Sequence, residues 1–224
     1  MPRIARVVAV GIPHHITQRG NYRQDIFLDD SDRRKYLLWI QEYSQKYHLN
    51  ILVYCLMRNH AHFIAIPQKE DSLARTFNTA HMRYSQYFNQ KIKTRGHLWQ
   101  GRFYSCVLDE PHLLMTAKYI ERNPVRARLV TMPWEWRWSS AGAHIGKDKE
   151  LISLDSLFSL IPMSIQEWKR YIVTQEQEVD IDTVRRHTYT GRPLGATEFI
   201  RKLEIRFNRR LIALPRGRPK KEQE

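Results

Sequence analysis

Two histidines, His60 and His62, flank Ala61 at the start of an apolar run that Pro67 ends. Side chains alternate between the two faces of a β-strand, so residues two apart point the same way. In a strand, His60 and His62 would present two imidazoles side by side, which is the arrangement that binds a divalent metal. Histidine pairs on a strand are also common as polar surface. The spacing therefore indicates a metal site only if the chain supplies a third ligand.

A second group of reactive residues belongs to a predicted helix that begins at residues 109–111 and ends near Asn123, because Pro124 follows. Tyr119 and Asn123 are four residues apart and share one face of this helix. The amide oxygen of Asn123 is an acceptable ligand for Mg²⁺ or Mn²⁺ beside two imidazoles, and Tyr119 would lie within reach of a phosphate held there. Taken alone, Tyr119 is equally explained as a core aromatic residue and Asn123 as a polar helix end.

The charge of the chain indicates a polyanionic partner. The 224 residues contain 37 Lys and Arg against 23 Asp and Glu, which gives a formal net charge of +14. No stretch approaches the roughly 18 consecutive apolar residues of a membrane span, so we expect no membrane partner. The start of the chain lacks the apolar segment of a secretory signal, which predicts a cytoplasmic protein. Cys55 and Cys106 lie in apolar runs and are expected to be buried thiols.

Hydrophobic periodicity predicts an α+β domain with antiparallel strand pairing. The predicted strands are 7–17, 49–57, 60–66 and 102–108, and the predicted helices are 30–47, 72–89 and 109–123. Residues 135–170 are irregular in pattern. We divide the chain into a domain at 1–145, an irregular linker at 146–180 and a basic helical appendage at 181–224.

The appendage is predicted to contain helices at 182–188 and 199–211, which could form a helix-turn-helix. The last 24 residues carry nine Lys and Arg against three Glu. Arg216 and Arg218 belong to an Arg-Gly-Arg-Pro element, which matches a motif that inserts into the minor groove of A·T-rich duplex DNA. A solvated basic tail is the alternative.

The loop after the second predicted helix contains basic and aromatic residues that suit a nucleic acid strand. Arg95 and Arg102 could bind phosphates, while His97 and Trp99 could stack on bases. Trp99 could equally belong to the core.

Other reactive residues have simpler explanations. Tyr84 and Tyr87 are rival nucleophiles, but their apolar neighbours at helical spacing favour packing. His14 and His15 could contact DNA or a metal, although histidines on an edge strand are more often surface residues.

Four blocks of the sequence resemble the IS200-like single-tyrosine transposases, and within them the REP-associated tyrosine transposase branch. The blocks are CLMRNHAHF at 55–63, GHLWQGRF at 96–103, YIERNPVRA at 119–127 and WSS at 138–140. The resemblance covers residues 4–143, with weaker similarity at 191–195 and 199–204. Several ordered blocks are far more specific than any single motif.

The resemblance implies a histidine–hydrophobic–histidine (HUH) nuclease with a ferredoxin-like antiparallel sheet, helices on one face of it, and here a basic helical appendage. Such enzymes cleave single-stranded DNA near a hairpin and leave a 5′-phosphotyrosine and a free 3′-hydroxyl. Carried over position by position, His60, His62 and Asn123 are ligands of Mg²⁺ or Mn²⁺, and Tyr119 is the nucleophile. Many insertion-sequence members have Gln at the third ligand, and Ala61 is small for the middle position. The implied location is the bacterial cytoplasm, at the nucleoid.

Three functions follow as hypotheses. The first is a transposase or strand transferase that cleaves and rejoins hairpin-bearing, REP-like single-stranded DNA. The alternative is a non-cleaving DNA- or RNA-binding regulator that retains the fold. A zinc hydrolase ranks below both, since the chain has no HExxH-type companion. The sequence leaves monomer and homodimer open.

Overall fold

The structure, a computed structural model, describes residues 5–147 and 151–213. Its strands form one antiparallel sheet in the order β2-β3-β1-β4. The strands are β1 (His14–Arg19), β2 (Leu49–Leu56), β3 (His60–Pro67) and β4 (Tyr104–Val107). With helices after β1 and β3, this order is that of a ferredoxin-like sheet. The predicted α+β class is therefore confirmed.

The helices follow in two groups along the chain. The first comprises α1 (Asp30–Lys46), α2 (Ser72–Lys91), α3 (Glu110–Glu121) and α4 (Asn123–Arg126). The second comprises α5 (Ala141–His144), α6 (Ile165–Val173), α7 (Glu178–Thr190) and α8 (Thr197–Phe207). Short 3-10 turns are η1 (Asn21–Arg23), η2 (Pro133–Glu135) and η3 (Leu157–Ser159). In the part of the chain that the structure describes, no helix is both long and apolar enough to cross a membrane.

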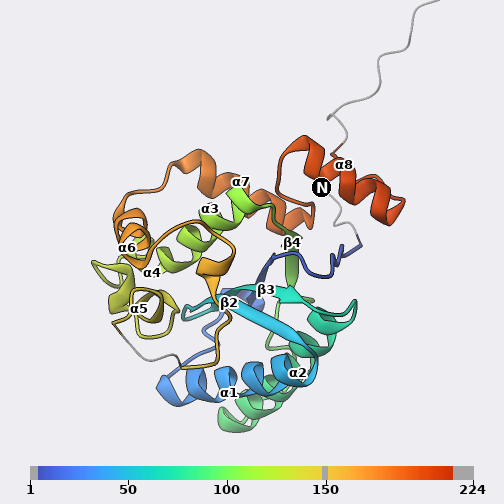
Figure 1. Cartoon of the computed structure of the whole chain (residues 1–224). Coiled ribbons are helices and arrows are strands. Elements are labelled where there is room, and N and C mark those ends of the chain that lie inside the picture. The colour runs from blue at the N-terminus through green and yellow to red at the C-terminus, as the bar shows by residue number, and fades with distance from the viewer. Residues whose placement is uncertain (1–4, 148–150, 214–224) are drawn as a thin grey trace, which may run out of the picture.

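Helices cover both faces of the sheet, rather than one face alone (Figure 1). Alternation along β3 explains why both faces are apolar. Ala61 and Phe63 belong to the cluster shared with α1 and α2, whereas Ile64 and Ile66 belong to the cluster shared with α3, α6 and α7. The second layer brings α3 and α7 onto the face toward which the even-numbered residues of β3 point.

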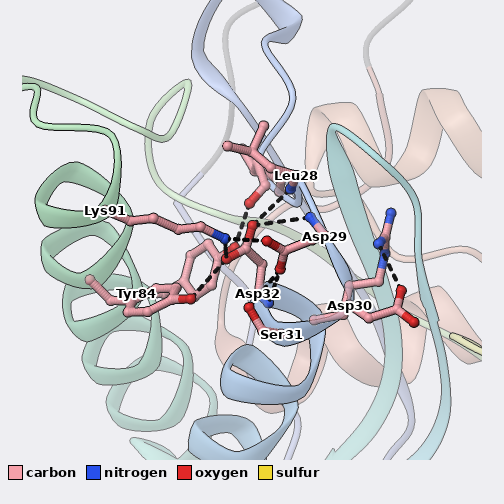
Figure 2. A network of polar contacts seen from close by, with 10 residues as sticks. Leu28, Asp29, Asp30, Ser31, Asp32, Tyr84 and Lys91 are labelled. Atoms are coloured by element: carbon pink, nitrogen blue, oxygen red, sulfur yellow. Dashed lines mark hydrogen bonds and ion pairs between the residues drawn. The ribbon is translucent and has the colours of Figure 1, made fainter.

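The start of α1 is joined to the end of α2 by a polar network (Figure 2). Asp29 is the N-cap of α1 and accepts a hydrogen bond from the backbone N–H of Asp32 at 3.1 Å. The buried Asp32 carboxylate accepts from Leu28 N–H at 2.8 Å and from Lys91 Nζ at 2.5 Å. The Lys91 ammonium also lowers the pKa of Asp29 below its ordinary value. The network fixes the segment that leads from β1 through η1 into α1.

Two sequence predictions of local structure are wrong. Residues 7–10 are not a strand, and β1 begins only at His14, after Gly11 has turned the chain at a φ of 79°. The irregular pattern of residues 135–170 predicts no regular structure there, but this segment contains α5 and most of α6. Ser164 and Glu167 form a capping box at the start of α6. Trp168 on α6 is fully buried, so this part of the expected linker contributes to the core.

The C-terminal helices differ from their predicted bounds. α7 extends beyond 182–188 at both ends, whereas α8 begins at Thr197 and ends at Phe207, short of the predicted end at residue 211. α7 ends at Thr190 and is followed by its C-cap Gly191, whose φ of 74° is the left-handed conformation that glycine adopts readily. α7 packs against β4, β1 and α3. Its Thr188 contacts His15 of β1 directly. Most of α7 belongs to the predicted appendage at 181–224, and this helix lies on the sheet.

Acid is expected to destabilise this fold through His81 of α2. Burial lowers the pKa of His81 from its ordinary value of 6.5 to about 3, with a smaller contribution from Arg6. Between these values the unfolded chain binds one more proton than the folded chain. The free energy of unfolding therefore falls with falling pH, by about 1.4 kcal/mol per unit for this residue.

Urea titrations between pH 4 and 6 test the effect by comparing the wild type with His81→Gln. The variant should show a shallower dependence of the unfolding free energy on pH, by about one proton. Equal slopes would show that His81 is not held neutral in the folded state.

Candidate active site

Strand pairing places three histidines on one side of the sheet. His60 and His62 share a face of β3, as their spacing predicted, and their ring centroids are 4.9 Å apart. His15 lies on the neighbouring strand β1, and its ring stacks on that of His62 at 5.2 Å between centroids. Thr17 of β1 pairs directly with His62. These residues all point toward the layer that contains α3 and α7.

The end of α3 and the start of α4 bring Tyr119 and Asn123 to the same place. The Tyr119 ring is perpendicular to the His62 ring, with centroids 5.8 Å apart. The Asn123 amide nitrogen donates to Nε2 of His60 at 3.4 Å. α3 ends at Glu121 before Pro124, near the predicted end. The structure thus brings together the residues that the sequence singled out for metal binding and nucleophilic attack.

These side chains line one cavity of about 1170 Å³. Strand and turn residues on its wall are His15, Thr17, Arg19, Arg23, His60, His62, Gln100 and Tyr104. Helical residues on its wall are Tyr119, Asn123, Val179, Asp182, Thr183, Arg185, Arg186, Thr188 and Tyr189. One wall of the cavity therefore belongs to α7, which the sequence did not place at the site.

Hydrogen bonds from α7 determine which nitrogen of His62 is available. The Thr188 hydroxyl donates to the Val184 carbonyl at 2.8 Å, so it accepts from Nδ1–H of His15 at 2.7 Å. Nε2 of a neutral His15 is then an acceptor, and it receives Nδ1–H of His62 at 2.9 Å. Nε2 of His62 keeps its lone pair.

His60 is also in the Nδ1–H tautomer, but different hydrogen bonds hold it there. Its Nδ1–H donates to the Asn59 side-chain oxygen at 2.6 Å, and its Nε2 is the acceptor for Asn123. Both histidines of β3 therefore keep the Nε2 lone pair, which is the form in which imidazole binds metals.

Burial keeps these imidazoles neutral. It lowers the pKa of His15 from the ordinary 6.5 to about 3. The pKa of His60 also falls to about 3, first by burial and then by the charges of Arg19 and Arg126. The pKa of His62 lies well below 6.5, mainly because of burial and then because His60 is close. At neutral pH the rings need lose no proton before they can bind a cation.

The donor set fits a divalent cation. Two neutral imidazoles and an amide oxygen are borderline and hard ligands of the kind that Mn²⁺ and Mg²⁺ accept. Rotating the Asn123 amide by half a turn would bring its oxygen, in place of its nitrogen, toward His60. Among residues 5–147 and 151–213, no three His, Cys, Asp or Glu side chains gather where they could hold a metal. The expected set differs from such a group in having an amide as its third member.

Tyr119 is held from its other side by Arg126. The guanidinium carbon lies 4.3 Å from the centroid of the Tyr119 ring, and the guanidinium donates to the Tyr119 carbonyl at 3.1 Å. Glu176, just before α7, pairs with Arg126 and with Arg122, the latter at 2.5 Å. The Tyr119 side chain therefore lies between the histidine rings and an arginine that is itself fixed.

The residues predicted to bind DNA do not gather at the cavity as the catalytic candidates do. Arg95, His97 and Arg102 are exposed in the segment between α2 and β4, and none of them lines the cavity. Trp99 is half-buried against the core, and its indole N–H donates to the His81 carbonyl at 2.9 Å. Packing accounts for this ring.

Arg216 and Arg218 lie outside the described residues. Binding of A·T-rich duplex DNA through them stays a prediction.

The role of the first strand at the site is not evident from the sequence. His14 and His15 were expected at the surface, but they are 0% and 1% exposed. β1 is an inner strand of the sheet, flanked by β3 and β4, so its histidines point into the protein and not into solvent. The only sequence signal was a pair of histidines in an apolar strand, which does not say what covers them.

Comparison with known proteins assigns the chain to a class. The family model described as transposase IS200 like matches residues 9–123, just over half of the 224 residues. The chain belongs to the IS200-like transposase family. The matched segment contains β1 to β4 and α3, and it ends at Asn123. No curated protein matches the chain.

A solved structure shares the fold. The structure of a REP-associated tyrosine transposase bound to a REP hairpin aligns with a TM-score of 0.53 at 16% identity, covering 70% of this chain and 96% of that one. A protein assigned as a transposase, from Deinococcus radiodurans R1, aligns with a TM-score of 0.37 at 17% identity, covering 54% and 97% of the two chains. The first match supports the ferredoxin-like fold described above.

Proposed function

We propose that this transposase cleaves and rejoins single-stranded, hairpin-bearing DNA by attaching it covalently to Tyr119. The observation that carries the proposal is the convergence of Tyr119, His60, His62 and Asn123 on one cavity. Membership of the IS200-like family supports the reaction class. The solved relative bound to a REP hairpin supports hairpin DNA as the ligand.

His60, His62 and Asn123 would hold Mg²⁺ or Mn²⁺, which when bound supplies polarisation of the scissile phosphate. The Tyr119 phenol oxygen attacks phosphorus in line, and the bond from phosphorus to the 3′ oxygen breaks. The phenol proton passes to water, and the departing 3′ oxygen takes up a proton to become a hydroxyl. The downstream strand stays on Tyr119 as a 5′-phosphotyrosine. Rejoining is the reverse reaction with a 3′-hydroxyl.

Arginines on the cavity wall would hold the strand during both steps. Arg19 and Arg23 lie at the end of β1 and in η1, and Arg185 and Arg186 lie across from them on α7. Guanidinium groups bind phosphate oxygens with paired hydrogen bonds. These arginines and the four catalytic candidates line the same cavity.

A denaturing gel tests the proposal with hairpin oligonucleotides drawn from the flanks of the gene. One set is labelled at the 3′ end and the other at the 5′ end, and Mn²⁺ is present with or without a chelator. A 3′ label should move to the mass of protein plus DNA only when Mn²⁺ is free. A 5′ label should instead appear in a shorter strand that ends in a 3′-hydroxyl. Salt-sensitive binding without any adduct would favour the non-cleaving regulator.

A further inference from the structure

A stacked pair of tyrosines forms part of the same cavity wall as Tyr119. Tyr189 lies at the end of α7 and Tyr104 begins β4. Their ring centroids are 5.4 Å apart and the planes differ by 21°. The Tyr189 residue is 62% exposed although its ring is supported from behind by Tyr104. A large aromatic side chain is thus held in place with much of its surface open to a ligand.

The helix places positive charge next to this ring. Arg185 and Arg186 precede Tyr189 by four and three residues, so they lie one turn away on the same side of α7. Both line the cavity together with Tyr189. Arg185 has an ion pair with Asp182 at 3.6 Å, and both side chains are more than half exposed, so this pair would exchange readily for a phosphate. An aromatic face beside guanidinium groups is the combination that binds single-stranded nucleic acid.

The cavity has room for more than the scissile phosphate. Its volume of about 1170 Å³ exceeds that of most small-molecule sites, which hold ligands in roughly 300–1,000 Å³. Base pairs in a duplex cover each other's faces, so only an unpaired base can offer its face to Tyr189. The positive charge of the wall disfavours an apolar protein surface, and its continuity with Tyr119 favours a DNA strand over an acidic protein surface.

We propose that Tyr189, supported by Tyr104, is the stacking site for one unpaired nucleotide of the DNA strand near the scissile phosphate, and that Arg185 and Arg186 bind the adjoining phosphates. This assignment rests on the proposed function, because it takes the strand to be the one that Tyr119 attacks. It gives α7 a direct part in substrate binding.

Binding measurements on full-length protein without divalent metal test the stacking site. Fluorescence anisotropy compares wild type, Tyr189→Ala and Tyr189→Phe on a hairpin with a single-stranded extension and on the same DNA made fully duplex. Tyr189→Ala should weaken binding of the single-stranded extension about 5- to 100-fold, whereas Tyr189→Phe keeps the aromatic face and should bind like wild type. Neither change should alter binding of the duplex. Because Tyr189 is exposed, both variants should fold, which circular dichroism checks.

The salt dependence of binding tests the phosphate contacts. Arg185→Gln should lower the slope of log K against log salt concentration by about 0.7, the value for one phosphate contact on a single strand. Arg34→Gln is the matched control, since Arg34 is an exposed arginine of α1 on the other face of the sheet. It should leave the slope unchanged.

The two proposals can fail separately. If wild type forms the covalent adduct but Tyr189→Ala binds the single strand as well as wild type, the stacking site is wrong and the proposed function stands. If no adduct forms but Tyr189→Ala alone loses single-strand binding, the stacking site stands and the cleavage reaction is wrong. Equal losses in Tyr189→Ala and Tyr189→Phe would also overturn stacking, because the second variant keeps the ring.

Discussion

Replacing Tyr119 by phenylalanine is expected to abolish covalent attachment of DNA and to leave DNA binding unchanged. The ring of Tyr119 is packed beside His62 and under Arg126, and phenylalanine preserves those contacts. Only the oxygen that would attack phosphorus is lost. Loss of a nucleophile typically lowers the rate by more than about a thousandfold. The gel with 3′-labelled hairpin DNA should therefore show no adduct, while anisotropy gives the wild-type affinity.

Tyr84→Phe and Tyr87→Phe are the matched controls, because both tyrosines lie on α2 behind the opposite face of the sheet. The Tyr84 hydroxyl donates to the Ile26 carbonyl, and the Tyr87 hydroxyl donates to Asp32 at 2.9 Å. Both variants should still form the adduct. An adduct that persists in Tyr119→Phe would place the nucleophile elsewhere and overturn the assignment.

Local patterns in the sequence are sufficient to predict most of the sheet and its first helices. The hairpin at Arg58 and Asn59 separates two apolar strands, and the structure pairs them in antiparallel fashion. The first strand was misplaced because Val7 and Val8 have strand propensity and nothing in their own sequence shows where the sheet begins. Tertiary pairing with β3 and β4 decides that His14 is its first residue.

The candidate site was predictable where its residues are close in sequence. His60 with His62 and Tyr119 with Asn123 are pairs whose spacing defines a common strand or helix face. His15, Thr188 and Tyr189 could not be found in this way, because their role arises from packing α7 against β1 and β4. His15 and Thr188 are more than 170 residues apart in the sequence. A contact at that separation produces no periodic pattern from which it could be predicted.

The opposite side of α3 bears a buried acid, Glu121. Glu121 is two residues from Tyr119, so its side chain points away from the cavity. It is 0% exposed. Its carboxylate accepts from Ser140 Oγ at 2.6 Å, from His144 Nδ1 at 2.5 Å and from Trp168 Nε1 at 3.2 Å. One carboxylate thus ties the helix that holds Tyr119 to α5 and α6.

Glu121→Ala is expected to lower the free energy of unfolding by about 3–5 kcal/mol, because it leaves three buried donors without their acceptor. Urea denaturation followed by circular dichroism measures the loss. Glu110→Ala, at an exposed position in the first turn of the same helix, should change the value by less than about 1 kcal/mol. A loss in Glu121→Ala as small as that of Glu110→Ala would mean that the carboxylate does not hold α3 in place. If the carboxylate does hold it, conditions that keep the variant folded should still show less adduct, since Tyr119 and Asn123 depend on the position of the same helix end.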